Sequence, residues 1–292
     1  MKIYDCTTFH SEHMMMDVRF NALNEHVHKF IVVESLFSHS GEKKKLNFDI
    51  NNYPKFKDKI IYLVIDREPD DLINPLNEKI QYKRINSIKR IELSYDFMMS
   101  EIKKLSDNDL IILSDNDEIP NLDSTQFKDS NSDIYIFKQL FFYYKFNLLY
   151  DRMYWFGSKA CTKKKLKSLS WLRNLKNKKY PLWRLDTFFS KTKSSSLKII
   201  NDGGWHFTNV MTAENLYTKM TNFGHHDEFE LSELSVEDLK IKINQGLVFY
   251  DHFAGQEDKN KWEFNYKLKK ISDNLLPDSL IKNKIKLKEW FN

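Results

Sequence analysis

Cysteine is scarce in this chain of 292 residues, which contains only Cys6 and Cys161. Two cysteines cannot form a disulfide-rich scaffold, so the composition indicates a protein of a reducing compartment. Glycine and proline are also scarce, at 7 and 6 residues, which excludes collagen-like chains and flexible Gly/Pro-rich chains. These shortages, together with a hydrophobic content of 41%, predict a packed globular protein.

Long hydrophobic runs are absent as well. The sequence has no apolar stretch of about 18 residues, so we expect no transmembrane segment. Its first residues, Met1–Asp5, lack the apolar region of a secretory signal peptide. From these two absences we predict a cytoplasmic location.

Charges of both signs are plentiful, and the formal net charge is only +5, from 46 basic and 41 acidic residues. The lysine runs Lys43–Lys45 and Lys163–Lys165 are typical of solvent-exposed faces. No nucleic-acid-binding motif accompanies these runs, so we expect no nucleic-acid partner. A basic surface is still compatible with phosphate-bearing ligands and with peripheral contact with an anionic membrane.

Apolar, β-branched runs alternate with segments of helical periodicity in the first 120 residues. Runs of this kind are typical of parallel strands that are buried on both faces. Their alternation with helices predicts an α/β fold, with helices on both sides of a mostly parallel sheet. The predicted strands are Lys2–Cys6, Phe30–Val33, Lys59–Ile65 and Leu110–Leu113, and the predicted helices are Glu12–Glu25 and Asn77–Leu105.

The pattern changes after Pro120, where aromatic residues and lysines become frequent. We find no linker and no internal repeat, so we predict one domain over residues 1–270, followed by a helical tail over residues 271–292. The predicted elements of this second part are one or two strands in Asp133–Tyr144, strands at Tyr154–Phe156 and Gly203–Phe207, and helices at Glu214–Phe223, Val236–Asn244 and Ile271–Asn292.

An acidic cluster follows the fourth predicted strand directly, with Asp115 and Asp117 two positions apart. In open α/β sheets, ligands bind at the carboxyl ends of the strands. Two carboxylates on such a turn can converge on Mg²⁺ or Mn²⁺, which prefer oxygen ligands and can offset the charge of a departing nucleoside diphosphate. The alternative is a plain acidic turn, in which Asp115 or Asp117 caps a following helix.

The string Ser114-Asp-Asn-Asp-Glu-Ile-Pro120 resembles the Asp-x-Asp-Glu-Ile-Pro signature of glycosyltransferase family 17. That family includes the β-1,4-mannosyl-glycoprotein 4-β-N-acetylglucosaminyltransferases. The resemblance covers roughly residues 3–255, although the lysine-rich segment Lys145–Lys198 matches no block of the family. The other matching blocks, in family order, are Tyr4-Asp5 with Phe9, Glu12 and Arg19; Val32–Ser35 with Phe37 and Gly41; Tyr82-x-Arg84; and Gly204–Phe207 with Lys219.

The resemblance implies a Rossmann-like GT-A fold that binds a nucleotide sugar, with a UDP-sugar donor, a divalent cation and inversion at the anomeric carbon. Residues 1–120 would then form the nucleotide-sugar-binding half of the domain, and residues 121–270 the half that binds the acceptor. The animal enzymes of the family carry a membrane anchor, whereas this sequence opens directly at the first predicted strand. The acceptor is therefore expected to be a saccharide or glycan of unspecified kind.

The matching positions suggest roles for individual side chains. Asp117 is the first candidate for a metal ligand, and Asp115 for a contact with the metal or the ribose. Glu118 would orient them or act as a catalytic base, or would simply be a helix-terminal charge. The remaining candidates are His206 as a further Mn²⁺ ligand or a core histidine, Arg84 and Lys219 as phosphate contacts or helix-surface charges, and Asp5 and Glu34 as contacts to uracil or ribose or as capping carboxylates.

An inverting transfer needs a general base that removes the proton of the acceptor hydroxyl. Four carboxylates remain open for this role: Glu118, Asp186, Asp227 and Glu228. Together these observations predict an inverting, Mn²⁺- or Mg²⁺-dependent glycosyltransferase that moves a sugar, with GlcNAc from UDP-GlcNAc favoured, to a saccharide acceptor in β-linkage. The alternatives are a nucleotidyltransferase-like enzyme, which the lack of a Gly-rich phosphate loop disfavours, and a catalytically silent carbohydrate-binding protein.

Overall fold

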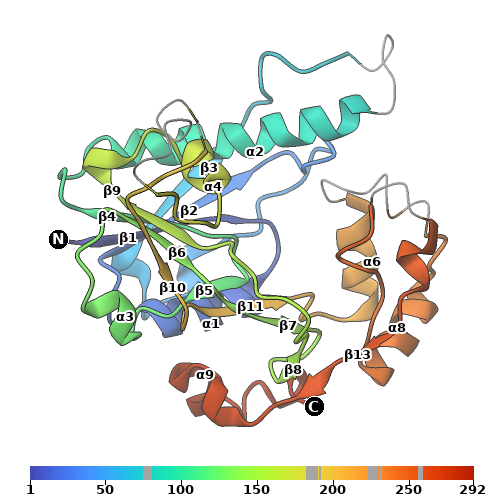
Figure 1. Cartoon of the computed structure of the whole chain (residues 1–292). Coiled ribbons are helices and arrows are strands. Elements are labelled where there is room, and N and C mark those ends of the chain that lie inside the picture. Colours follow the sequence, from blue (N-terminus) through green and yellow to red (C-terminus); the bar gives the residue numbers. More distant parts are fainter. Residues whose placement is uncertain (75–80, 182–189, 191, 223–228, 230–231, 256–258) are drawn as a thin grey trace.

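The computed structural model describes residues 1–74, 81–181, 190, 192–222, 229, 232–255 and 259–292. A central sheet with helices above and below it forms the larger part of the molecule, and a smaller helical part lies beside it (Figure 1). Within the described residues, no helix is both long enough and apolar enough to cross a membrane.

The central sheet has seven strands in the order β10-β6-β9-β4-β1-β2-β3. All of them run parallel except β9, which is antiparallel to both of its neighbours. This confirms the predicted α/β fold with a mostly parallel sheet. The strands are β1 (Ile3–Phe9), β2 (Lys29–Ser35), β3 (Ile60–Ile65), β4 (Leu110–Leu113), β6 (Ile134–Phe137), β9 (Lys159–Thr162) and β10 (Leu197–Ile200).

Apolar side chains on the two faces of this sheet form separate cores. On one face lies α1 (His13–Leu23), whose Phe20 packs against Phe30 of β2 and whose Leu23 shares this core with Ile112 of β4. On the other face lie α2 (Gln81–Ile102) and α4 (Leu169–Asn174). Since β4 is buried along its whole length, its four apolar residues satisfy both cores at once.

A second sheet of five strands, in the order β14-β8-β7-β11-β5, adjoins the first. Strand β5 (Glu118–Pro120) directly follows the acidic turn, and it pairs antiparallel with β11 (Gly204–Thr208), so that His206 lies opposite Glu118. This pairing brings two segments that are almost ninety positions apart in the sequence to one place. The other strands are β7 (Leu140–Tyr143), β8 (Leu148–Leu149) and β14 (Lys269–Lys270).

The smaller part packs on this second sheet through a third apolar core, which includes Phe141, Leu216 and Leu239. It contains α6 (Ala213–Asn222), α8 (Val236–Gln245) and a short ribbon of β12 (Leu247–Val248) and β13 (Tyr266–Lys267), at the right of Figure 1. The remaining short elements are α3 (Thr125–Lys128), α9 (Asp278–Lys282) and 3₁₀ helices at Ile50–Asn52, Lys57–Lys59, Lys163–Lys165, Lys259–Glu263, Asp273–Leu275 and Lys288–Trp290.

Two predicted elements differ from the structure. Residues Tyr154–Phe156 form no strand, and Trp155 makes only an isolated bridge to Gln139. The strand of this region is β9, in which every residue is buried although it begins with Lys159. Its position inside a sheet, rather than an apolar pattern of its own, makes it a strand, which explains why the sequence did not reveal it.

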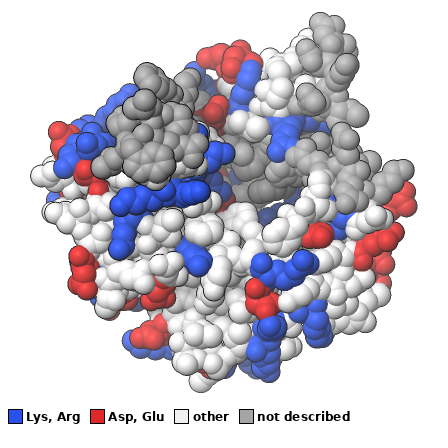
Figure 2. Space-filling model, viewed as in Figure 1, with Lys and Arg blue, Asp and Glu red and all other residues white. Residues whose placement is uncertain are grey.

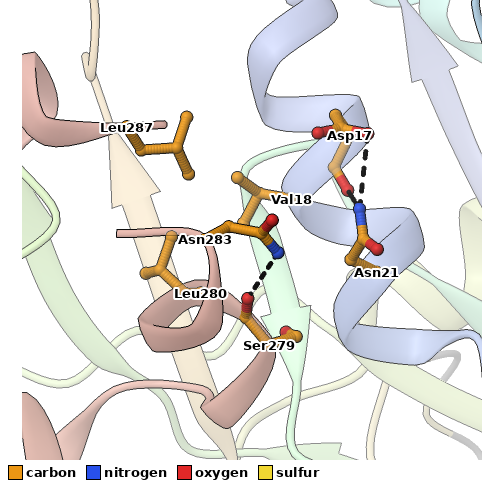
Figure 3. Close-up of a pocket in the computed structure, with 7 residues that line it drawn as sticks. All are labelled: Asp17, Val18, Asn21, Ser279, Leu280, Asn283 and Leu287. Carbon is orange, nitrogen blue, oxygen red and sulfur yellow. Dashed lines mark hydrogen bonds between the residues drawn. The ribbon is translucent and has the colours of Figure 1, made fainter. Parts of the chain in front are cut away.

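The C-terminal tail is not one long helix, as the sequence predicted, but a series of short helical pieces. Leu276, Leu280 and Leu287 of the tail are buried in the core that α1 shares. Side chains of the tail and of α1 line a cavity of about 10 Å³ at this contact (Figure 3). A space of this size holds one water molecule at most, so the tail is a packing element and this cavity is not a ligand site.

We expect Leu280→Ala to lower the free energy of unfolding by about 2–5 kcal/mol, because Leu280 is 1% exposed and its loss opens a cavity against α1. Urea unfolding followed by circular dichroism measures this change. The matched control is Leu275→Ala in the same tail, where the side chain is 47% exposed and we expect a change within about 0.5 kcal/mol. Equal effects of the two variants would contradict the packing role of the tail.

Candidate active site

The acidic turn lies at the carboxyl end of β4, where the two sheets meet. The turn is closed by a hydrogen bond of 3.1 Å from the amide of Glu118 to the carbonyl of Asp115. Ser114, just before the turn, donates through its hydroxyl to Ser158 at 2.8 Å. The three carboxylates of Asp115, Asp117 and Glu118 are therefore held on a defined backbone, and they face different partners.

A buried arginine supports the turn from the side of α1. Arg19 is fully buried and donates to both carboxylate oxygens of Asp5, at 2.8 and 2.5 Å. The same guanidinium donates to the carbonyls of Asp115 and Glu118, at 3.1 and 2.6 Å. Asp5 is also fully buried. Both of its oxygens bind Arg19 and neither reaches solvent, so its contact with a nucleotide is not visible in this structure and stays a prediction.

The side chain of Glu118 is fully buried. Its carboxylate accepts hydrogen bonds from the indole of Trp155 at 2.6 Å, from the backbone amide of Asp115 at 2.9 Å and from Arg173 at 3.2 Å. Burial opposes the negative charge, but Arg173 and His206 outweigh it and hold the pKa of Glu118 below its usual value. Groups of the protein itself therefore surround the carboxylate of Glu118. Its role as general base stays a prediction.

Asp117 faces the second sheet, where the structure brings it together with His206 and Lys219. Its carboxylate lies 3.4 Å from Nε2 of His206 and 4.0 Å from Nζ of Lys219. Burial again opposes the charge, yet His206 and Lys219 lower the pKa of Asp117 to about 2. Asp117 is therefore ionised at any physiological pH. Asn209, whose φ of 57° is one that asparagine tolerates, accepts a hydrogen bond from Lys219 at 3.3 Å.

Two aromatic rings fix the orientation of His206. Phe141 stacks on the imidazole, with the ring centroids 4.8 Å apart and an interplanar angle of 5°. The ring centroid of Trp155 lies 4.7 Å from that of the imidazole. Nδ1 is buried and has no hydrogen-bond partner among the residues that the structure describes. The stack therefore directs Nε2 at Asp117 without help from a hydrogen bond at the other nitrogen.

Asp117 and His206 fit two adjacent ligands of one cation. Ligands about 2.1 Å from an ion at neighbouring octahedral positions lie about 3 Å apart, close to the 3.4 Å between Asp117 and His206. The predicted third ligand, Asp115, points elsewhere: its carboxylate binds Arg173 at 2.6 Å. No group of three or more His, Cys, Asp or Glu side chains in the described part of the chain is arranged to hold a metal, so the predicted three-residue set is not assembled.

The carboxylate of Asp115 is half exposed, with 50% of its side chain accessible. Partial burial raises the pKa of Asp115 to about 6, and its neighbours Glu118 and Asp117 add to this effect, while Arg173 opposes it. Asp115 and Asp117 therefore differ strongly in their readiness to carry a charge, although only one residue separates them.

Of the other predicted binding residues, Glu34 is also enclosed by groups of the protein itself, so its contact with a nucleotide stays a prediction. Its side chain is buried and accepts hydrogen bonds from Lys44, from Tyr62 at 2.8 Å and from the backbone amides of Asn47 and Phe48 at 2.8 and 2.9 Å. Glu34 therefore holds the segment after β2 in place. Arg84 lies in the first turn of α2, and its role at a phosphate stays a prediction. The base candidates Asp186, Asp227 and Glu228 lie outside the described residues.

Arg173 is the functional residue that the sequence did not reveal. It comes from α4, inside the lysine-rich segment that matches no family block, and no local pattern separates it from the surrounding basic residues. Arg19 left a clearer signal, because it shares the apolar face of α1 with Met15 and Met16. A charge on such a face indicates a buried partner.

Lys and Arg side chains are spread over the face of the molecule in Figure 2, with acidic side chains between them. The formal net charge of +5 agrees with this distribution. A net positive charge favours the approach of anionic ligands such as phosphates.

Gly157→Ala should disrupt the site, because a Cβ at this position would lie 1.7 Å from Oε1 of the buried Glu118. We expect the free energy of unfolding to fall by about 1–3 kcal/mol, the usual cost of overpacking, in urea titrations. Gly255→Ala is the control, since a Cβ there meets nothing within 4 Å. A Gly157 variant as stable as the control would show that Glu118 is not held as tightly as its contacts indicate.

Comparison with known proteins bears on the family of this chain. A search of curated proteins finds no match. Among solved structures, the chain is similar to the inositol-1-phosphate CTP transferase from T. maritima, at 14% identity and a TM-score of 0.36, over 76% of this chain and 96% of that one. It is also similar to the glycosyltransferase GlyE of Streptococcus pneumoniae TIGR4, at 12% identity and a TM-score of 0.31, over 100% of this chain and 65% of that one.

With TM-scores this low, neither likeness bears on the site. The family itself is shown by the model of glycosyltransferase family 17, which matches residues 1–286, nearly the whole chain. The chain therefore belongs to glycosyltransferase family 17, and it is a glycosyltransferase that acts on a sugar donor and an acceptor.

Proposed function

We propose that this protein is an inverting, divalent-metal-dependent glycosyltransferase that moves GlcNAc from UDP-GlcNAc to a saccharide acceptor. The observation that carries the proposal is the convergence of Asp117 and His206, 3.4 Å apart, at the carboxyl end of a buried parallel strand. Ligands of open α/β sheets bind at this end. The UDP-GlcNAc donor and the saccharide acceptor follow from the family resemblance of the sequence blocks around these two residues.

Asp117 and His206 would hold the cation, with the remaining positions left to the donor and to water. Mn²⁺ or Mg²⁺, when bound, would neutralise charge on the leaving diphosphate. Asp117 suits this task because its low pKa of about 2 keeps the carboxylate ionised. His206 suits it because the stacked rings direct Nε2 toward Asp117.

Lys219 supplies a further positive charge on the same side of the turn. Its ammonium lies 4.0 Å from Asp117 and is oriented by Asn209. Lysine binds phosphate as a point charge, so Lys219 would stabilise the diphosphate as its negative charge grows during transfer. The proposed chemistry of the site is thus the stabilisation of the leaving diphosphate by the cation and by Lys219.

Asp117→Asn should reduce release of UDP from UDP-GlcNAc by at least ~100-fold, because loss of a metal ligand removes several kcal/mol of leaving-group stabilisation. An assay of free UDP with and without MnCl₂ measures this. The control is Asp96→Asn on the exposed side of α2, which should retain full activity. Undiminished turnover in Asp117→Asn would overturn the proposed function, and release of pyrophosphate instead of UDP would indicate nucleotidyl transfer.

His206→Phe tests the metal separately from the fold, because phenylalanine can keep the stack on Phe141 and Trp155 but offers no ligand nitrogen. Titration calorimetry should show that Mn²⁺ strengthens UDP binding in the wild-type protein. In His206→Phe this gain should fall by at least ~10-fold, since even outer-shell changes cost metal sites this much. The exposed His28 gives the control variant His28→Phe. A gain from Mn²⁺ that survives in His206→Phe would remove His206 from the metal site.

A further inference from the structure

Arg173 contacts the acidic turn with two different ends of its guanidinium. Nη1 lies 3.2 Å from the carboxylate of Glu118 and 3.2 Å from the carbonyl of Gly157, and both of these partners are buried. Nη2 lies 2.6 Å from the carboxylate of Asp115, whose side chain is 50% exposed. One end of the guanidinium is therefore anchored inside the protein, and the other reaches the side of the turn that solvent and ligands can approach.

A buried lysine holds the backbone of Arg173. Lys159, on β9, is only 5% exposed, and its ammonium donates to the carbonyls of Arg173 and Leu175 at 2.6 and 2.7 Å. These carbonyls lie at the end of α4, where no helical amide reaches them and a cation is favoured. Burial lowers the pKa of Lys159 to about 8, with Arg173 adding to the effect. The ammonium of Lys159 thus fixes the backbone from which the side chain of Arg173 reaches the turn.

The charges around the turn are arranged in two pairs. Arg173 contacts the turn through Asp115, and Lys219 contacts it through Asp117. Arg173 and Lys219 thus place one positive charge at each end of a short turn. A diphosphate has two phosphates, one for each of these charges. Arginine binds phosphate through two parallel N–H groups, which a lysine cannot do.

We propose that Arg173 is a phosphate-binding residue of the donor site and that Lys159 is its positioning residue. This inference rests on the proposed function. In the protein without donor, Asp115 occupies Nη2 of Arg173; when the donor binds, an oxygen of the diphosphate takes the place of Asp115, while Glu118 and the carbonyl of Gly157 keep Nη1 where it is. Asp115 is then released and can turn toward Asp117 and the donor.

The test compares UDP with uridine, which lacks the phosphates, in the presence of a fixed concentration of MgCl₂, which is diamagnetic and leaves NMR signals sharp. Calorimetry gives the dissociation constant of UDP, and ligand-observed NMR gives that of uridine. Arg173→Gln should weaken UDP binding by ~10–100-fold, the range of charge-assisted hydrogen bonds, and should leave uridine binding unchanged. Arg173→Lys should recover part of the loss, because it restores the charge without the paired N–H groups.

Lys159→Met should produce the same selective loss in a weaker form, since it keeps the guanidinium of Arg173 but removes the ammonium that positions its backbone. Arg67→Gln is the control, because Arg67 is 60% exposed and pairs with Asp70 at the surface; it should bind both ligands normally. Thermal unfolding reports whether each variant is folded, and Arg173→Gln decides the question even where Lys159→Met does not fold.

The outcomes separate this inference from the proposed function. Normal UDP binding by Arg173→Gln, or an equal loss of UDP and uridine binding, would overturn the role of Arg173 while the wild-type protein still binds UDP. A wild-type protein that binds no UDP, with or without Mn²⁺, would instead overturn the proposed function itself.

Discussion

The buried ion pair between Arg19 and Asp5 is the contact on which the rest of the site depends. Both side chains are inaccessible to solvent, and the guanidinium also binds the carbonyls of Asp115 and Glu118. A buried pair of this kind is tolerated only when every hydrogen-bonding group finds a partner, and here the backbone of the turn provides the remaining partners. The acidic turn therefore takes its shape from β1 and α1 and not from its own sequence alone.

A turn with three carboxylates in four residues would repel itself if all three had the same surroundings. The structure gives each of them a different environment. Glu118 is buried and held by Trp155 and Arg173, Asp117 faces His206 and Lys219, and Asp115 stays half exposed. The pKa of Asp117 falls to about 2 while that of Asp115 rises to about 6. Residues of one chemical type thus differ in burial, in their partners and in their readiness to carry a charge.

Much of this arrangement could be predicted from local sequence. The apolar strands are visible as short β-branched runs, and the acidic turn is recognisable because it follows one of them directly. The family blocks also place Asp117, His206 and Lys219 in one site, as the structure does. These features could be predicted because the strand, the turn and the adjoining block each depend on residues that are close together in the sequence.

The features that the sequence did not reveal have a common physical cause, which is contact between residues that are far apart in the sequence. Glu34 lies near the end of β2, whereas Asp5 lies inside β1, which continues to Phe9, and groups from α1 and from the segment after β2 bind these carboxylates. A sequence does not show whether a carboxylate at a strand end faces a ligand or an arginine of its own chain. Strand β9 and Arg173 were missed for the same reason, because a lysine-rich segment becomes a central strand only through pairing with β4 and β6.

The second sheet explains why blocks so far apart in the sequence belong to one site. Antiparallel pairing of β5 with β11 sets His206 opposite Glu118, and the amide of Phe207 donates to the carbonyl of Asp117 at 2.8 Å. A slip of one residue in this register would turn His206 to the other face of its sheet and away from Asp117. The approach of His206 to Asp117 is therefore a property of strand register, and backbone hydrogen bonds between β5 and β11 couple the two blocks.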